Sequence, residues 1–170
     1  MRLFDMFTGT KRPAVGTLAL PKEEVKRRLL ALNRPTAPWQ VTDGATDGVD
    51  LVAEWRLNED SYKDAFHQSK KETVFRILMK LDEVAHEVRA SDREYQASWG
   101  VDGFKLSASV SGFRGQKQTV SFGGPTFFTE RLPSGETIAY HFATREIKKP
   151  LQDAVTSSGW TYKGVAFGKL

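Results

Sequence analysis

The sequence contains no cysteine, which excludes disulfides, thiolate zinc sites, iron–sulfur clusters and cysteine nucleophiles. Histidine is also scarce, and His67, His86 and His141 show no metal-ligand spacing such as HxxxH. No apolar run approaches the roughly 18 residues of a membrane span. Asp5 interrupts the short apolar cluster at the N-terminus, so no secretory signal is predicted. These absences predict a cytoplasmic protein with no metal and no cofactor.

The charge of the chain is mildly positive and unevenly distributed. Among the 170 residues, 25 are basic and 21 acidic, a net charge of +4. Residues 1–35 contain eight basic and three acidic residues, whereas residues 36–66 contain two basic and seven acidic residues. Hydrophobic residues make up 39% of the chain, an ordinary globular composition. The length fits one domain, and the positive ends favour an anionic partner.

The N-terminal part divides into an arm and a helix. Residues 1–20 are predicted to be an extended arm, and residues 21–170 a single domain. A helix is predicted from Lys22 to Leu32, because no breaker interrupts this segment and Val25, Leu29 and Leu32 recur at helical spacing.

Alternating apolar residues predict strands through the middle of the chain. The clearest runs are 49–57, 104–110, 119–122, 126–132 and 137–142. Residues 34–48 are predicted to be turns because they contain Pro35, Pro38, Gly44 and Gly48. A short helix is predicted for residues 58–69.

Residues 73–97 fit two structures. Their apolar residues match one face of a helix and, equally well, the faces of two strands joined near Asp82. We favour the hairpin because the flanking segments are strands, and sequential strands tend to pair.

Near the C-terminus, Thr144 is predicted to cap a helix that runs to Ser158. Pro150 favours either a later start, near residue 149, or a kink. A last strand is predicted over 160–167. The fold class that follows is α+β: a curved antiparallel sheet or partial barrel of six to eight strands, with N-terminal and C-terminal helices.

Two short motifs suggest ligand sites and are better explained as turns. The spacing of Asp43, Asp47, Gly48 and Glu54 matches a calcium loop, but Ala45 stands where a carboxylate is needed. The segment Gly112-Phe113-Arg114-Gly115 has the form of a GxxG loop that clamps a nucleic-acid backbone. That loop belongs between two helices, whereas strands are predicted on both sides here.

The leading functional prediction is a non-catalytic binding or accessory domain. It would contact an anionic partner, a lipid surface or a nucleic acid, through the basic residues around the C-terminal helix. These candidate binding residues are Arg145, Lys148, Lys149 and Lys163.

The alternative prediction is a small hydrolase or isomerase. Its general base would be His141, assisted by a carboxylate such as Glu54 or Asp92. No complete catalytic motif accompanies these residues, so the sequence favours binding over catalysis.

Three blocks of sequence resemble a family of small bacterial proteins to which no activity is assigned. They are residues 29–38, Phe113-Arg114-Gly115-Gln116, and residues 159–170. The resemblance implies a bacterial origin and one intact domain, and it carries no functional residues. A strand-rich sheet with a C-terminal helix is also similar, at the level of fold alone and without a shared motif, to tubby-like and scramblase-like barrels that engage membrane lipids.

Overall fold

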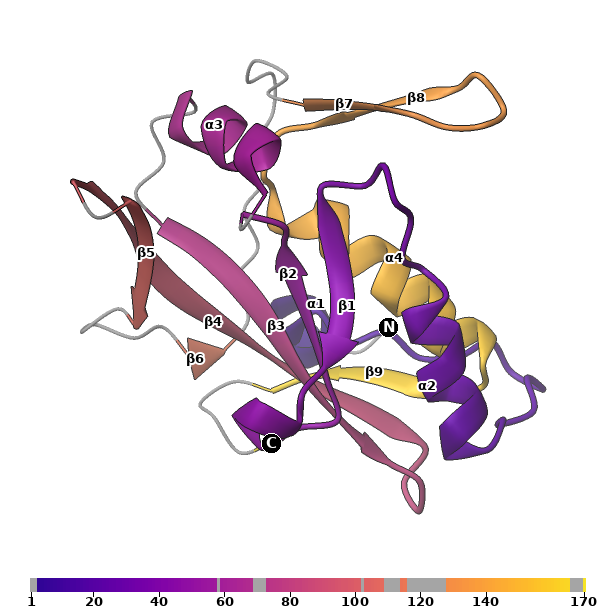
Figure 1. Ribbon diagram of the computed structural model, residues 1–170. Coiled ribbons are helices and arrows are strands. Elements are labelled where there is room, and N and C mark those ends of the chain that lie inside the picture. The colour runs from indigo at the N-terminus through magenta and orange to yellow at the C-terminus, as the bar shows by residue number, and fades with distance from the viewer. Residues whose placement is uncertain are drawn as a thin grey trace.

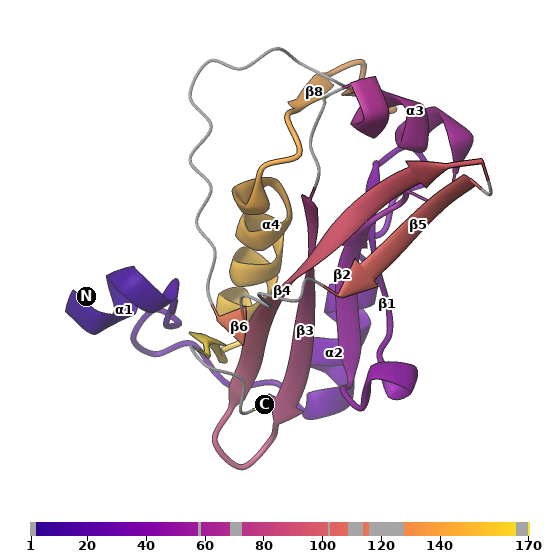
Figure 2. The same cartoon turned by 90° about the vertical axis from the view of Figure 1, so that its left-hand side faces the viewer.

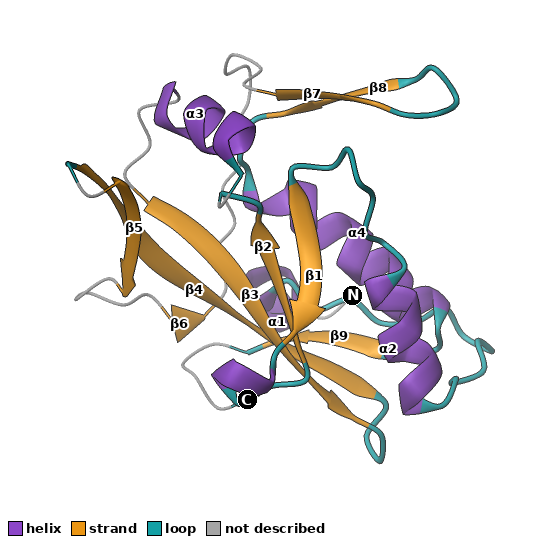
Figure 3. Ribbon diagram, in the orientation of Figure 1, coloured by secondary structure: helices purple, strands orange, loops and turns teal. Residues whose placement is uncertain are grey.

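The computed structural model describes residues 3–57, 59–68, 73–101, 103–108, 114–115, 128–165 and 170 (Figure 1). Within these residues the chain has the α+β architecture that the sequence predicts, with a mostly antiparallel sheet and helices near both ends (Figure 3). The strand expected over 119–122 lies outside the described residues, as do Gly112 and Phe113 of the GxxG segment.

The main sheet is open and has one parallel pair. Its strands are β1 (Trp39–Asp43), β2 (Leu51–Trp55), β3 (Thr73–Asp82), β4 (Glu87–Gly100), β5 (Gly103–Ala108), β6 (Arg114–Gly115) and β9 (Thr161–Gly164). The first five are neighbours in chain order, while β6 and β9 also pair with β4. Among the strands of the described residues, only β9 runs parallel to its partner. A separate hairpin consists of β7 (Phe128–Arg131) and β8 (Thr137–Tyr140).

Residues 73–97 form the predicted hairpin. The register of β3 on β4 runs without a break from Thr73 opposite Gln96 to Asp82 opposite Glu87. His86 adopts a left-handed backbone with φ of 50° in the connecting turn. Strand pairing therefore overrides the helical propensity of the residues around Asp82.

Two N-terminal segments differ from their predicted structure. Within the predicted arm, Leu3–Thr8 forms a short helix, α1. Within the predicted turns, Trp39–Asp43 forms β1, which pairs with β2 from Trp39 opposite Trp55. The Asn33 side chain supports β1 by bonding both the carbonyl and the N–H of Val41, at 2.8 and 2.7 Å. The prolines precede this strand rather than interrupt it.

Two helices cover one face of the sheet. These are α2 (Lys22–Leu30) and α4 (Thr144–Ser157), which lie beside each other (Figures 1 and 2). Their buried residues, including Leu29 and Leu151, pack with Ala53 and Ile77 in a single core. The predicted helix at residues 58–69 is α3 (Asp60–Gln68), and Phe66 anchors it against Phe142 and Trp99. None of the helices in the described ranges has the length and apolar character needed to cross a bilayer.

The acidic residues of the calcium-like spacing serve as partners for basic side chains. Asp47 lies on the turn before β2, and its carboxylate is 3.0 Å from the Arg76 guanidinium. Glu54 binds the same guanidinium at 2.9 Å, and Asp43 pairs with Lys26 at 3.7 Å. Across the part of the chain that the structure describes, no group of three acidic or histidine side chains is placed to hold a metal ion.

Candidate functional site

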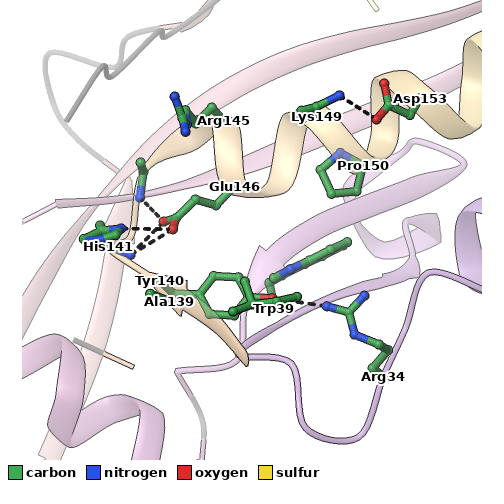
Figure 4. Close-up of a pocket in the computed structure, with 12 residues that line it drawn as sticks. Arg34, Trp39, Ala139, Tyr140, His141, Arg145, Glu146, Lys149, Pro150 and Asp153 are labelled. Carbon is green, nitrogen blue, oxygen red and sulfur yellow. Dashed lines mark hydrogen bonds and ion pairs between the residues drawn. The ribbon is translucent and has the colours of Figure 1, made fainter. Parts of the chain in front are cut away.

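A cleft of about 520 Å³ opens along α4, and we call it the α4 cleft (Figure 4). One wall is formed by α4 and by the end of β8. The other wall comes from the connection between α2 and β1. Its lining residues are Arg34, Trp39, Ile138, Ala139, Tyr140, His141, Ala143, Arg145, Glu146, Lys149, Pro150 and Asp153.

A strained backbone positions His141 at the cleft. The next residue, Phe142, has a φ of 57°, which is unfavourable for a side chain of this size. Its ring is buried between Trp55 and Phe66, with ring centres 5.0 and 5.4 Å away. This aromatic packing offsets the strain and fixes the turn from β8 into α4. His141 is therefore left half-exposed on the cleft wall.

Glu146 caps the start of α4 from inside the cleft. Its carboxylate accepts the backbone N–H of Ala143 at 2.7 Å and that of His141 at 2.9 Å. The helix is thus capped by Glu146 rather than by Thr144, the predicted cap. The Nδ1 atom of His141 also lies 3.5 Å from this carboxylate. The positive end of the α4 dipole is already neutralised by the protein's own carboxylate.

The opposite wall is held by a buried carboxylate. Glu130 of β7 is 1% exposed, and Arg34 donates two hydrogen bonds to it at 2.6 and 3.0 Å. The Tyr140 hydroxyl donates a third at 2.8 Å. The bonds from Arg34 lower the pKa of Glu130. Burial, together with the bond to Glu130, raises the pKa of Tyr140 to about 12. Glu130 therefore holds Arg34 in place, and Arg34 forms part of the cleft wall.

Two exposed cations of α4, Arg145 and Lys149, are among the residues that line the cleft, one helical turn apart. The Arg145 guanidinium makes no hydrogen bond or ion pair with any residue of the described ranges, and Figure 4 shows no contact to it. Lys149 pairs with Asp153 at 2.8 Å, and both side chains are mostly exposed. Such an exposed pair contributes about 0–1 kcal/mol, so an incoming anion can compete for Lys149.

The structure separates the four basic residues that the sequence predicted as one binding patch. Arg145 and Lys149 line the α4 cleft, whereas Lys148 points into the core. The Lys148 ammonium lies 2.6 Å from the Asp92 carboxylate, with 6% and 1% of the two side chains exposed. Lys163 lies on β9 and binds Glu87 at 3.1 Å.

The two carboxylates that the sequence suggested for His141 lie elsewhere. Glu54 binds Arg76 on β3, and Asp92 binds Lys148 beneath α4. The carboxylate that His141 does approach is Glu146. Glu146 lies five residues after His141 and at the third position of α4. An acidic residue at this position is the sequence signal of a capping box.

The sequence does not reveal Arg34 and Trp39 as part of the site. They reach the cleft because the α2–β1 connection lies against β8, and no local pattern encodes that contact. The burial of Lys148 does have a local signal. Thr144, Lys148, Leu151 and Val155 recur at intervals of four, three and four residues, which places the lysine on the buried stripe of α4.

A second cavity, of about 440 Å³, lies between β2, α3 and β5. Trp55, Leu57, Phe104 and Leu106 make it largely apolar. Its charged residues, Glu54 and Lys63, are engaged with Arg76 and Asp60. The α4 cleft is the better candidate because it offers a guanidinium that no described residue engages.

Comparison of the chain with protein-family models, with curated proteins and with solved structures gives no match. The residues of the α4 cleft are therefore the basis on which a function is assigned.

Proposed function

We propose that the protein is a binding domain whose α4 cleft takes a small ligand carrying a carboxylate or phosphate group. The observation that carries this proposal is Arg145, an exposed guanidinium that engages no described residue, one helical turn from Lys149. A guanidinium forms paired hydrogen bonds with planar or tetrahedral anions, and an ammonium adds a mobile point charge. The pair suits an anion with at least two free oxygens.

The placement of the charges along the cleft supports an anionic ligand. Its lining contains Arg34, Arg145 and Lys149 together with the carboxylates of Glu146 and Asp153, and Arg34 binds the further carboxylate of Glu130. Glu146 is occupied by backbone N–H groups and Arg34 by Glu130. Arg145 engages no described residue and Lys149 makes an exposed pair with Asp153, so these two cations are the groups that we expect to meet a ligand.

The rest of the lining suits the body of an organic ligand. Ile138, Ala139 and Pro150 contribute apolar surface beside the cationic residues. Ligand sites commonly combine apolar walls with a few fixed polar groups, and this cleft falls within their usual range of about 300–1,000 Å³. We therefore expect an organic anion to bind more tightly than inorganic phosphate.

Thermal unfolding at low salt tests this proposal, with inorganic phosphate and citrate as probes. Citrate is expected to raise the melting temperature of the wild-type protein more than phosphate does, because a ligand that binds only the folded state stabilises it. R145A and K149A should each lose most of this shift. K80A is the matched control, since Lys80 lies on β3 and lines neither cavity described here.

Two results would reject the proposal. One is the absence of a shift with either probe at low salt. The other is an equal loss of the shift in K80A and R145A, which would mean that the anions act through general screening rather than in the cleft.

The contact between His141 and Glu146 supports a second candidate, a small hydrolase or isomerase that uses His141 as its base. Engagement of Glu146 as a helix cap makes this the weaker candidate. An esterase assay with p-nitrophenyl acetate distinguishes the two. Turnover above the buffer rate that is lost in H141A and retained in R145A would favour the enzyme.

A further inference from the structure

Asp153 places a carboxylate in the α4 cleft beside the two cations. Its side chain is 64% exposed, and it accepts one hydrogen bond from the described residues, donated by the Lys149 ammonium at 2.8 Å. The other carboxylate of the lining, that of Glu146, accepts backbone N–H groups of His141 and Ala143. A carboxylate has about four acceptor positions, so Asp153 keeps acceptor capacity that a ligand can use.

The three charged side chains follow one another along α4. Arg145, Lys149 and Asp153 are spaced four residues apart, which places them on successive turns along the same side of the helix. All three line the cleft, and Figure 4 shows Lys149 and Asp153 joined along the helix. A ligand that lies along α4 therefore meets two cations followed by a carboxylate.

Capture of an anion by Lys149 brings that anion close to Asp153. The Asp153 carboxylate is 2.8 Å from the Lys149 ammonium, and an anion hydrogen-bonded to the same ammonium lies about 3 Å from it. The two negative groups are then within about 6 Å of each other. Like charges at this distance repel unless a positive group compensates them. A ligand that carries its own cation removes this repulsion and replaces the partner that Asp153 loses.

We infer that the ligand of the α4 cleft is an organic anion that also carries an ammonium group. Its anionic groups bind Arg145 and Lys149, and its ammonium binds Asp153, which makes Asp153 the specificity-determining residue of the site. The inference rests on the proposed function and narrows the ligand class to amino-acid-like molecules. Only a few bonds separate the opposite charges of such a ligand, because Lys149 and Asp153 are adjacent.

Two matched probes, glutamate and 2-methylglutarate, test the inference. They are the same dicarboxylate with either an ammonium or a methyl group on the carbon next to one carboxylate. General attraction to cations favours 2-methylglutarate, which has the larger net negative charge. The inference predicts the reverse order. In nuclear magnetic resonance titrations at neutral pH and low salt, the wild-type protein should bind glutamate about threefold more tightly, as expected for one exposed ion pair.

D153N should reverse this order. Loss of the carboxylate frees Lys149 and removes the repulsion, so 2-methylglutarate should bind about threefold more tightly than it binds the wild type. Glutamate should gain nothing, because it loses its partner for the ammonium. D60N is the matched control: Asp60 is an exposed residue of α3 that pairs with Lys63 and lines neither cavity described here. It should keep the wild-type order of the two probes.

Two outcomes overturn the inference and leave the proposed function standing. In one, the wild-type protein binds 2-methylglutarate at least as tightly as glutamate. In the other, D153N strengthens the binding of both probes by the same factor, which would make Asp153 only an internal competitor for Lys149. If neither probe gives saturable shifts, the proposed function fails and this inference fails with it. Both variants change exposed side chains, so equal melting temperatures are expected and confirm folding.

Discussion

Lys148 on α4 and Asp92 on β4 form an ion pair inside the protein, with 2.6 Å between the ammonium nitrogen and the carboxylate oxygen. Both side chains are almost completely buried. Burial removes the water that would otherwise solvate each charge, so each charge depends on its protein surroundings. The pair joins the helix that lines the cleft to the longest strand of the sheet.

K148M tests the importance of this pair for stability. It leaves the Asp92 carboxylate buried without its cation, which is expected to lower the free energy of unfolding by about 3–5 kcal/mol. Urea denaturation measures the loss. The matched control is K149M, whose exposed pair with Asp153 should cost less than about 1 kcal/mol. Equal losses of unfolding free energy in the two variants would show that the buried pair contributes no more to stability than the exposed pair does.

The carboxylate of Glu130 predicts a dependence of stability on acid pH. Arg34 lowers the pKa of Glu130 in the folded protein below the ordinary 4.5. The unfolded chain therefore binds a proton more readily, and stability falls as the pH decreases from about 4.5 through the folded pKa. Above pH 4.5 the contribution of this group is fully present.

Urea denaturation of the wild type and of E130Q across this pH range provides the measurement. E130Q should be less stable at neutral pH and should lose less stability on acidification than the wild type does. Parallel curves for the two proteins would contradict the assignment of this acid dependence to Glu130.

Gly159 is predicted to tolerate no side chain. Its φ is +75°, and an added Cβ atom would lie 2.3 Å from the backbone oxygen of Leu18. The N-terminal arm passes at this point, where Leu20 donates its N–H to Ser158. G159A therefore combines a left-handed conformation, which costs about 1–2 kcal/mol, with a backbone clash of about 1–3 kcal/mol.

G16A separates these two effects. Gly16 has a similar φ of +86°, but no atom lies within 4 Å of the position of an added Cβ. We expect G16A to lower the free energy of unfolding by the conformational cost alone and G159A by clearly more. If chemical denaturation gives the same loss of unfolding free energy for G16A and G159A, the N-terminal arm does not lie as close to residue 159 as the structure places it.

Local sequence patterns were sufficient for much of the fold. The apolar spacing along residues 73–97 fits a helix and a hairpin equally well, and the strands predicted on either side favoured the hairpin, which the structure confirms. The stripe of Val25 and Leu29 identified α2. The parallel pairing of β9 with β4 was not predictable, because residues more than 70 positions apart meet there and no periodicity records it. Strand β1 was missed because the prolines before it favour turns.

The candidate site was only partly predictable for the same reason. Arg145 and Lys149 were predicted as binding residues because they are basic residues of the C-terminal helix, and His141 was predicted separately, as a general base. Arg34 is 96 residues from Glu130, its partner, so its place in the cleft depends on tertiary packing. The spacing of Lys148 to Leu151 places the lysine on the buried stripe of α4, but Lys148 was predicted as a surface binding residue because it is charged.

The most direct test of the α4 cleft as an anion site is a nuclear magnetic resonance titration of the isotope-labelled protein with citrate at low salt. The account predicts saturable shifts of the backbone amides of residues 138–146 and of Lys149, weakened at least about tenfold in R145A, as expected for loss of a charge-assisted contact. Shifts of similar size spread over the whole protein, or saturable shifts that R145A leaves unchanged, would contradict it.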